Sequence, residues 1–456
     1  MASVTQTRGA PAAPPYAPPS SGPYAGQPRA PHAGPPPVPS RGGVVLRPTA
    51  SPGRGGSFRL QQLVLIETAA ALLLAAWVVE PLLLAPAAVV AGVLVLLAVA
   101  RRRRRALPEW LATLLALRAR VRRAATAVVP AGTDPGLAPV VECDPALRTY
   151  AFGERAGDSA RERRPVGLIG DGTFLTAVVR VESDGAALRP DRAAHPLPVG
   201  LVRDVLEVDG IRLESAQIVQ HTQPAPAPHL SDRSMAARNY APLQALTGAP
   251  SLRITWIALK LDPELCPEAV AARGGGLLGA QRCVVRAADQ LASRLAGAGS
   301  GFRATVLTEQ ELTAALATSA GADPRALGEP VRGRARAPRT RETARTWRCD
   351  DSRHTTYWVG RWPQLEGAAM PRLVALLTSL PATATTFSLT LSGGAGDRRE
   401  ATVTGHVRIT GRDDAQLLAA RHELERAARG VRVGLVRLDR EQVPGVLATL
   451  PLGGAR

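Results

Sequence analysis

The sequence predicts an α/β (α+β) cytosolic region behind an N-terminal transmembrane hairpin of two helices. The first observation is an apolar run of 38 residues, 63–100, whose polar members are Glu67, Thr68 and Glu80. The second is the alternation of β-branched strands with amphipathic helices after residue 165. This alternation occurs twice in the order strand, helix, two strands, helix, strand. We interpret it as two related units, each similar to a split βαβ sandwich.

The apolar run is too long for one membrane span. A single helix of this length would measure about 57 Å, whereas the hydrocarbon core of a bilayer is about 30 Å thick. Glu80-Pro81 divides the run, because proline lacks an N–H and disfavours a helical conformation in the residue before it. We therefore expect helices over 63–79 and 82–100. The alternative, a buried helical hairpin of a soluble domain, is hard to reconcile with the five arginines that follow.

The distribution of charge predicts the orientation of this hairpin. Residues 1–59 contain arginine but no Asp or Glu, and residues 101–105 are all arginine. Both basic flanks should stay on the cytoplasmic side of the cell membrane, with Glu80 outside. The reverse orientation is the alternative. The formal net charge of +18 is thus explained mainly by topology and by anionic lipid.

The remaining chain divides by composition. The tail is rich in proline and glycine and cannot bury enough apolar surface to fold. After the hairpin, apolar residues at helical spacing predict a helix that either lies on the inner leaflet or packs on a partner. We assign a disordered Pro-rich cytoplasmic tail (1–59), the hairpin with its arginine stop (60–105), a juxtamembrane amphipathic helix (106–124), a linker (125–164), a first α/β unit (165–320), a basic linker (321–341) and a second α/β unit (342–456).

No pattern of residues demands catalysis or a cofactor. A P-loop needs a lysine after its glycine-rich turn, but the one lysine, Lys260, lies on a predicted strand. The glycines at 167–172 are typical of a hairpin turn. The histidines and the four cysteines form no metal-binding spacing, and we expect the cysteines to be reduced. Aromatic residues make up 4% of the chain, which argues against a nucleic-acid surface.

Two clusters in the second unit could carry function. Asp350-Asp351 could hold a divalent ion, although such a pair more often forms a turn or a helix cap. A cluster of aromatic residues lies among arginines and reads either as a strand of the core or as a protein-contact surface. Its members are Trp347, Tyr357, Trp358 and Trp362.

The hairpin and the helix after it carry further candidates for an interface. Glu67 lies near the cytoplasmic start of the first helix, where interfacial placement or helix packing is more typical than proton transfer. Small residues on both helices, among them Ala75 and Gly92, permit close helix packing. Trp110 marks the membrane interface if the helix after the hairpin lies on the inner leaflet; if that helix continues into the cytosol, it packs on a partner instead.

Four stretches of this chain resemble the EccE family of type VII (ESX) secretion, in its streptomycete branch. They are VGLIGDGTFLTAVVRVE (166–182), GIRLESAQIVQHTQPAPAPHL (210–230), SLRITWIALKLDPELCPEAVAARGGG (251–276) and RTWRCDDSRHTTYWVGRWP (345–363). The resemblance implies a subunit of an inner-membrane secretion complex with EccB, EccC and EccD as neighbours. It also implies that the EccC ATPase supplies the energy.

We therefore expect a two-pass cell-membrane protein, with both termini cytoplasmic, that anchors and scaffolds a large hetero-oligomeric complex without enzymatic activity of its own. One alternative is a membrane-anchored enzyme with a glycosyltransferase-like domain that uses Asp350 and Asp351. The other is a lone membrane-tethered binding module.

Overall fold

A computed structural model of the protein describes most of the chain after residue 44. The described ranges are 45–48, 57–99, 101–102, 105–126, 129–130, 132–153, 165–183, 197–223, 252–297, 301–323, 338–362, 382–393 and 400–454, with single positions at 235, 238, 239, 377 and 380. These residues all belong to one compact unit, Val44–Arg456. Most of the predicted tail and much of the basic linker lie outside the described residues.

The apolar run forms a helical hairpin that breaks at the predicted position. Helix α1 covers Ser57–Val79, a 3₁₀ turn η1 covers Pro81–Leu83 and helix α2 covers Leu84–Val99. Where α1 and α2 meet, the buried positions are alanines: Ala69 and Ala76 on α1, and Ala87 and Ala91 on α2. Among the described residues, no helix is both long enough and apolar enough to span a bilayer.

The segment between the hairpin and the first predicted unit contains more structure than expected. Helix α3 covers Leu107–Thr126 and agrees with the predicted juxtamembrane helix. The predicted linker 125–164 includes helix α4 (Ala138–Cys143) and strand β4 (Arg148–Phe152). Its Pro/Gly-rich composition concealed these short elements, which are stabilised by burial of Val140, Val141 and Leu147.

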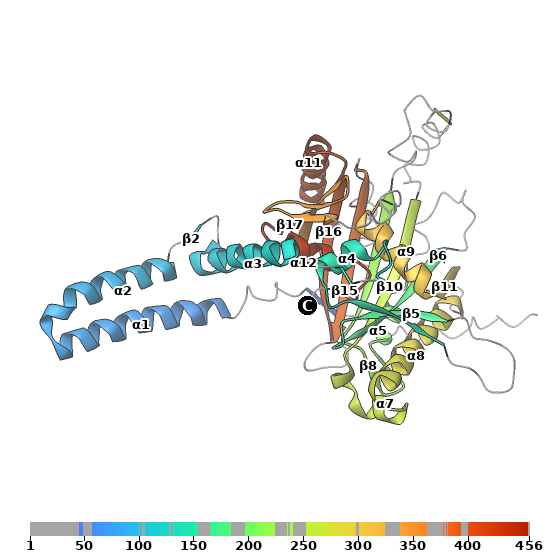
Figure 1. The fold of residues 1–456 in the computed structure, drawn as a ribbon, viewed down its shortest axis with the longest axis horizontal. Helices are drawn as coiled ribbons and strands as arrows, with labels where there is room; N and C mark the ends of the chain where they lie inside the picture. The colour runs from blue at the N-terminus through green and yellow to red at the C-terminus, as the bar shows by residue number, and fades with distance from the viewer. Residues whose placement is uncertain are drawn as a thin grey trace, which may run out of the picture. The chain divides into compact units, whose positions relative to one another are not determined.

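In the described residues, one sheet of thirteen strands forms the centre of the body (Figure 1). Its order is β12-β13-β14-β16-β15-β9-β10-β6-β5-β4; in addition, β17 pairs with β14, β11 with β6, and β1 (Val45–Pro48) with β16. The bounds not yet given are β5 (Val166–Gly170), β6 (Leu175–Ser183), β9 (Ser215–Gln223), β10 (Leu252–Leu261), β11 (Phe302–Val306), β12 (Thr340–Glu342), β13 (Trp347–Cys349), β14 (Ser352–Arg361), β15 (Ala384–Gly393), β16 (Glu400–Gly411) and β17 (Gly434–Arg437). Short two-stranded ribbons are formed by β2 (Arg101–Arg102) with β3 (Arg105–Ala106) and by β7 (Glu207–Val208) with β8 (Ile211–Arg212).

Strand β1, Val45–Pro48, is a difference from the prediction of a disordered tail. It pairs in parallel with β16, with Val45 opposite Glu400. The local sequence VVLRP explains the pairing, because a short apolar, β-branched run inside a polar tail favours addition to a sheet edge. The other strand pairs of the sheet are antiparallel.

The sheet joins the two predicted α/β units at its centre. Strand β9 of the first unit pairs with β15 of the second, with Ser388 opposite Val219. On either side of this junction the order is β9-β10-β6 and β15-β16-β14. Each half also adds a strand and a helix at its end: β11 and α9 in the first half, and β17 and α12 in the second.

Helices cover both faces of the sheet, and the strands alternate accordingly. On β10, Ile257 and Leu259 contribute to one core, whereas Trp256 and Ala258 contribute to the other. The first core is closed by α5 (Val199–Asp204), α7 (Pro267–Ala272), α8 (Gly276–Gly297) and α11 (Asp414–Gly430). The second core is closed by α4, α9 (Glu309–Ala320) and α12 (Gln442–Leu447).

Candidate functional site

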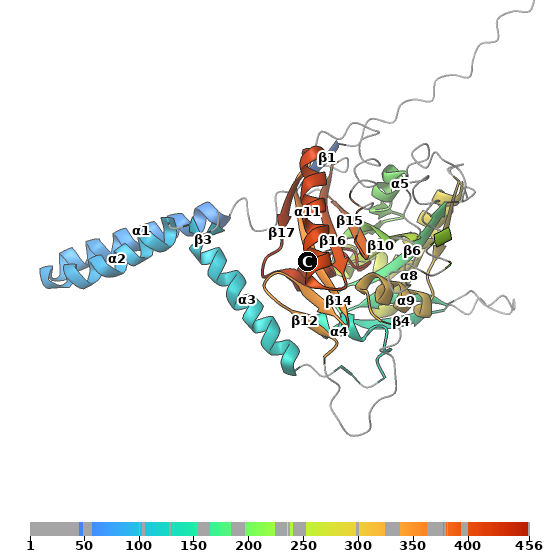
Figure 2. The same cartoon turned by 90° about the horizontal axis from the view of Figure 1, so that it is seen from above.

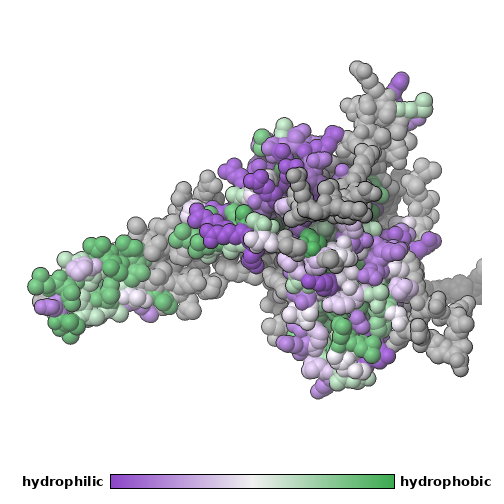
Figure 3. Space-filling model, viewed as in Figure 1, coloured by the Kyte–Doolittle hydropathy of each residue, from purple (hydrophilic) through white to green (hydrophobic). Residues whose placement is uncertain are grey.

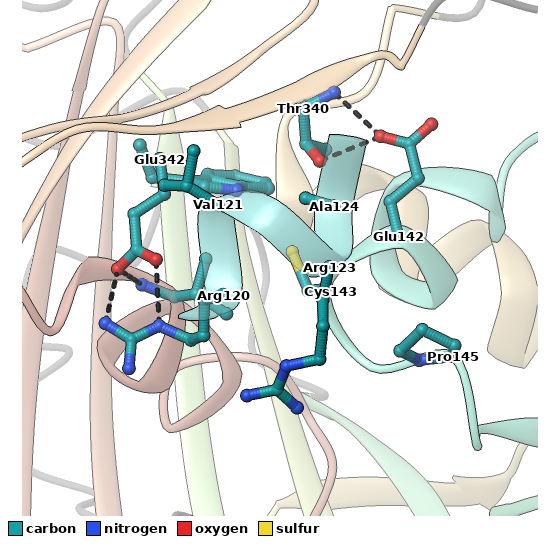
Figure 4. Close-up of a pocket in the computed structure, with 11 residues that line it drawn as sticks. Arg120, Val121, Arg123, Ala124, Glu142, Cys143, Pro145, Thr340 and Glu342 are labelled. Atoms are coloured by element: carbon teal, nitrogen blue, oxygen red, sulfur yellow. Dashed lines mark hydrogen bonds and ion pairs between the residues drawn. The ribbon is translucent and has the colours of Figure 1, made fainter. Parts of the chain in front are cut away.

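Helix α3 is attached to the edge of the sheet by one arginine. The Nε of Arg120 donates to Oε2 of Glu342 on β12 at 2.9 Å, and its Nη2 donates to Oε1 at 3.1 Å. The same Nη2 also donates to the carbonyl oxygen of Arg440 at 2.5 Å. The side chain of Glu342 is 4% exposed, and it accepts a further hydrogen bond from the backbone N–H of Val443 at the start of α12. We call this set of contacts the α3 clamp; Figure 4 shows the part of it between Arg120 and Glu342.

A second contact at the N-terminal end of α3 supports the clamp. The guanidinium of Arg440 lies 5.2 Å from the centroid of the Trp110 ring, which is within the range of a cation–π interaction. Arg440 has a positive φ of 66° and donates its backbone N–H to the carbonyl oxygen of Ala344. Trp110, predicted at a membrane interface, is thus partly buried against the body of the protein. Figure 2 shows α3 passing beside β12.

A small cavity of about 130 Å³ lies between α3, α4 and the sheet edge. Glu142 on α4 faces it and accepts hydrogen bonds from the backbone N–H and the hydroxyl of Thr340, both at 2.8 Å (Figure 4). Burial raises the pKa of the nearby Cys143 thiol well above its usual value, with smaller contributions from Cys349 and Glu142. This thiol is therefore a poor nucleophile. The residues around the cavity connect α3, α4 and the sheet edge, and they do not form a reaction centre.

Asp350 and Asp351 occupy a turn between β13 and β14. Asp350 has a φ of 48° and forms a bidentate pair with Arg339, at 2.9 Å for Nε to Oδ1 and 2.6 Å for Nη2 to Oδ2. The hydrogen bond to Asp350 raises the pKa of Arg339. Asp350 also accepts from the backbone N–H of Asp323, whereas the Asp351 side chain is 95% exposed. The two carboxylates thus have separate environments, which is the arrangement of a structural turn.

The structure places the aromatic cluster mainly inside the second unit. Trp347, Tyr357 and Trp358 are buried, and the centroid of the Trp347 ring lies 4.9 Å from that of the His354 ring, with the two planes tilted by 45°. The Tyr357 hydroxyl donates to Oε1 of Glu425 at 2.8 Å, and burial raises its pKa to about 12. Trp362 is half-buried. Of the two interpretations of this cluster, a strand of the core agrees better with the burial of its side chains than a protein-contact surface does.

The predicted hairpin candidates lie on outward surfaces. Glu67, Ala75 and Gly92 are exposed, and a Cβ added at Gly92 would meet no atom within 4 Å. Large apolar side chains of the hairpin are exposed too, among them Leu74, Trp77 and Leu82 (Figure 3). The most exposed large apolar residues of the hairpin are Trp77 (66%), Val78 (75%), Val79 (73%), Leu82 (82%) and Val89 (69%).

A polar group that sequence patterns did not reveal lies on the second face of the sheet. Arg408 on β16 is 1% exposed and donates through Nη2 to the carbonyl oxygen and hydroxyl of Ser319. Ser319 lies at the C-terminal end of α9, where the helix dipole is negative and favours a cation. Burial lowers the pKa of Arg408 to about 10. The sequence feature that could have indicated this buried contact is an arginine within a strand that otherwise carries Val, His and Thr.

The four cysteines are free thiols, and three of them are buried. Within the part of the chain that the structure describes, no group of three or more His, Cys, Asp or Glu residues is arranged to hold a metal ion.

The role of Arg120 was also not predicted from the sequence. This residue lies at helical spacing from Trp110, Thr113 and Leu117, so a charged residue on the inward face of the helix was the sign of a specific contact.

Residues 249–359 match the model of one protein family, described as "Putative type VII ESX secretion system translocon, EccE". The matched segment runs from β10 through α8, α9 and the clamp residue Glu342 to β14. The predicted resemblance to the EccE family is therefore confirmed over this segment, whereas its placement in a streptomycete branch stays a prediction. A comparison with curated proteins found no match.

Proposed function

We propose that this chain is a non-catalytic structural subunit of a type VII protein secretion complex. The observation that carries the proposal is that the EccE match covers the sheet edge to which α3 is clamped through Glu342. Helix α3 directly follows the apolar hairpin in sequence. The chain thus combines a recognisable secretion-family body with a fixed connection to an apolar, outward-facing hairpin.

We propose that the hairpin anchors the chain in the cell membrane as two passes, with both termini cytoplasmic. The exposed apolar side chains of α1 and α2 support this anchoring, because such a surface is stable only in contact with lipid or another apolar surface. The basic flanks support the orientation. Labelling of a cysteine introduced at Glu80 in intact cells tests it; an unlabelled Glu80→Cys protein that becomes labelled only after lysis contradicts this topology.

The partners that we propose are EccB, EccC and EccD, with EccC supplying the energy. We also propose that the body consists of two related units, 165–320 and 342–456. The matching strand orders on both sides of the β9–β15 junction support that division. The catalytic alternative at Asp350 and Asp351 has less support, because Asp350 is engaged by Arg339 and Asp351 points to solvent.

Gentle detergent extraction followed by sizing tests the subunit assignment. The chain should elute in an assembly many times its own mass, together with the three proposed partners. Bulky substitutions Ala75→Leu and Gly92→Leu should release it from the assembly while leaving it in the membrane fraction. Gly92→Leu is informative because a Cβ at this position would meet no atom of this chain within 4 Å. We therefore expect its main effect on the contact with a neighbouring subunit.

The matched control is Val90→Leu, a conservative change at another exposed position of α2. It should leave the assembly intact. Ala91→Leu, in contrast, enlarges a residue that is 3% exposed in the contact between α1 and α2, and should disturb the hairpin itself. Elution of the unmodified chain alone would overturn the proposal. Unchanged co-purification of the Ala75 and Gly92 variants would reduce the hairpin to a plain anchor.

A further inference from the structure

Helix α3 has two faces, and the body of the protein uses one of them. Trp110, Leu114, Leu117 and Arg120 are partly buried, and Trp110 and Arg120 make the contacts of the clamp region. These four positions fall on one side of a helix with 3.6 residues per turn. The opposite side is left exposed.

The exposed side combines leucine with arginine at regular spacing. Its members are Leu111, Leu115, Arg118 and Arg122, at i, i+4, i+7 and i+11. Leu111 is 41% exposed and Leu115 is 60% exposed. A helix that already packs one apolar side against its own body has no folding reason to carry two further leucines on the other side. We call these four residues the outer face of α3.

The chemistry of the outer face matches an anionic lipid surface. Leucine side chains can enter the boundary between headgroups and acyl chains, while the long arginine side chains extend to the phosphates. The preceding segment adds Arg101–Arg105 to the same stretch of chain. Each basic residue near an anionic leaflet contributes to binding through the negative surface potential.

Chain connectivity keeps the start of α3 near the membrane if the hairpin is the anchor. Eight residue steps separate Val99, the end of α2, from Leu107, the start of α3. A chain of that length extends at most about 28 Å. The start of α3 therefore remains near the surface in which the hairpin is inserted. An acidic protein could pair with the arginines of the outer face. It would not explain why two exposed leucines lie on the same face, close in sequence to an apolar anchor.

We propose that the outer face of α3 binds the anionic surface of the inner leaflet while the inner face stays clamped to the body. This inference rests on the proposed function, because it takes the hairpin as the membrane anchor. The clamp then holds the β12 edge of the sheet at the membrane surface. Arg118 and Arg122 select anionic headgroups, and Leu111 and Leu115 insert.

A fluorescent probe on the full chain tests the proposal. An environment-sensitive dye is attached at Leu115→Cys, with the dye-treated unmodified chain as background for its own cysteines. The protein is reconstituted in vesicles of phosphatidylcholine with or without phosphatidylglycerol, and lipids carrying a nitroxide near the headgroup serve as quenchers. We expect strong quenching with phosphatidylglycerol and at least a severalfold loss of quenching with Arg118→Gln and Arg122→Gln combined.

Ala116→Cys is the matched control, because Ala116 is exposed on α3 but lies about 100° around the helix from Leu115. Its probe should be quenched much less. Failure of the unmodified chain to float with pure phosphatidylcholine vesicles would contradict the hairpin anchor of the proposed function. Flotation without lipid quenching at Leu115 would overturn the present inference alone. A probe at Leu115 that is shielded only in the intact secretion complex would also overturn it, in favour of a protein partner.

Discussion

Replacing Arg120 with methionine should release α3 from the sheet edge. The change removes the guanidinium but keeps most of the apolar stem, so it isolates the polar contacts. Arg120 makes two hydrogen bonds to the Glu342 carboxylate and one to the Arg440 carbonyl oxygen. Glu342 is 4% exposed, so water replaces the lost partner poorly.

The expected cost follows from this burial. Breaking one side of a buried ion pair costs about 3–5 kcal/mol. Here the Arg120 side chain is 20% exposed to solvent, and Glu342 retains the hydrogen bond from the backbone N–H of Val443 after the substitution. We therefore expect a smaller loss of about 2 kcal/mol, which corresponds to about a 30-fold increase in the open population of the helix.

Amide hydrogen exchange of α3 measures this population directly, because exchange through local opening tracks the free energy of opening. The Arg120→Met protein should exchange about 30-fold faster in α3, with little change in β9 and β10 at the centre of the sheet. Arg123→Met is the control, since the exposed Arg123 contacts the carbonyl oxygen of Ala119 within its own helix. A change of less than about threefold for Arg120→Met, or an equal change for Arg123→Met, would refute the clamp.

Two further predictions concern buried charge. Burial, followed by the charge of Arg408, lowers the pKa of His221 to about 3 and that of His354 well below its usual 6.5, so both are neutral in the folded protein. Each of these histidines takes up a proton near pH 6.5 in the unfolded chain, so the free energy of unfolding should decrease below that pH by up to about 1.4 kcal/mol per pH unit for each histidine. Thermal melting of the purified protein between about pH 7 and pH 5 measures this decrease. His221→Gln should make the dependence of stability on pH less steep. Asp350→Asn should cost about 2–4 kcal/mol by weakening the pair with Arg339, whereas Asp351→Asn should stay within about 0.5 kcal/mol. Loss of secretion in the stably folded Asp351→Asn protein would instead favour the catalytic alternative.

Hydrophobic patterns in the sequence predicted the principal strands and the break in the hairpin. The runs SLRITWIALKL and HTTYWVGR, rich in apolar and β-branched residues, correspond to β10 and β14, because a strand that is buried on both faces carries few polar interruptions. The Glu80-Pro81 break follows from proline chemistry and needs no tertiary information. The composition of 125–164, in contrast, hid α4 and β4, because elements of five or six residues gain their stability from the body that they contact.

Contacts between distant residues could not be predicted in this way. Arg408 and Ser319 are 89 positions apart, and Arg120 and Glu342 are 222 apart. Periodicity predicts which face a side chain occupies, but not which partner it meets there. For Trp347 and Tyr357 the pattern allowed both core and surface, and burial of both residues by neighbouring strands decides where they lie.

The C-terminal segment around Ala448–Gly453 contacts the first half of the sheet. The side-chain amide of Gln217, on β9, donates to the carbonyl oxygen of Ala448 at 2.9 Å, and its Oε1 accepts from the backbone N–H of Gly453 at 2.8 Å. A Cβ at Gly453 would lie 2.4 Å from that of Lys260, so the C-terminal segment passes directly over β10. The second half is thus tied to the first by this segment as well as by the β9–β15 pairing. Because the clamp attaches α3 to the same body, a shift of the helix should move both halves together, which is consistent with the scaffold role that we propose.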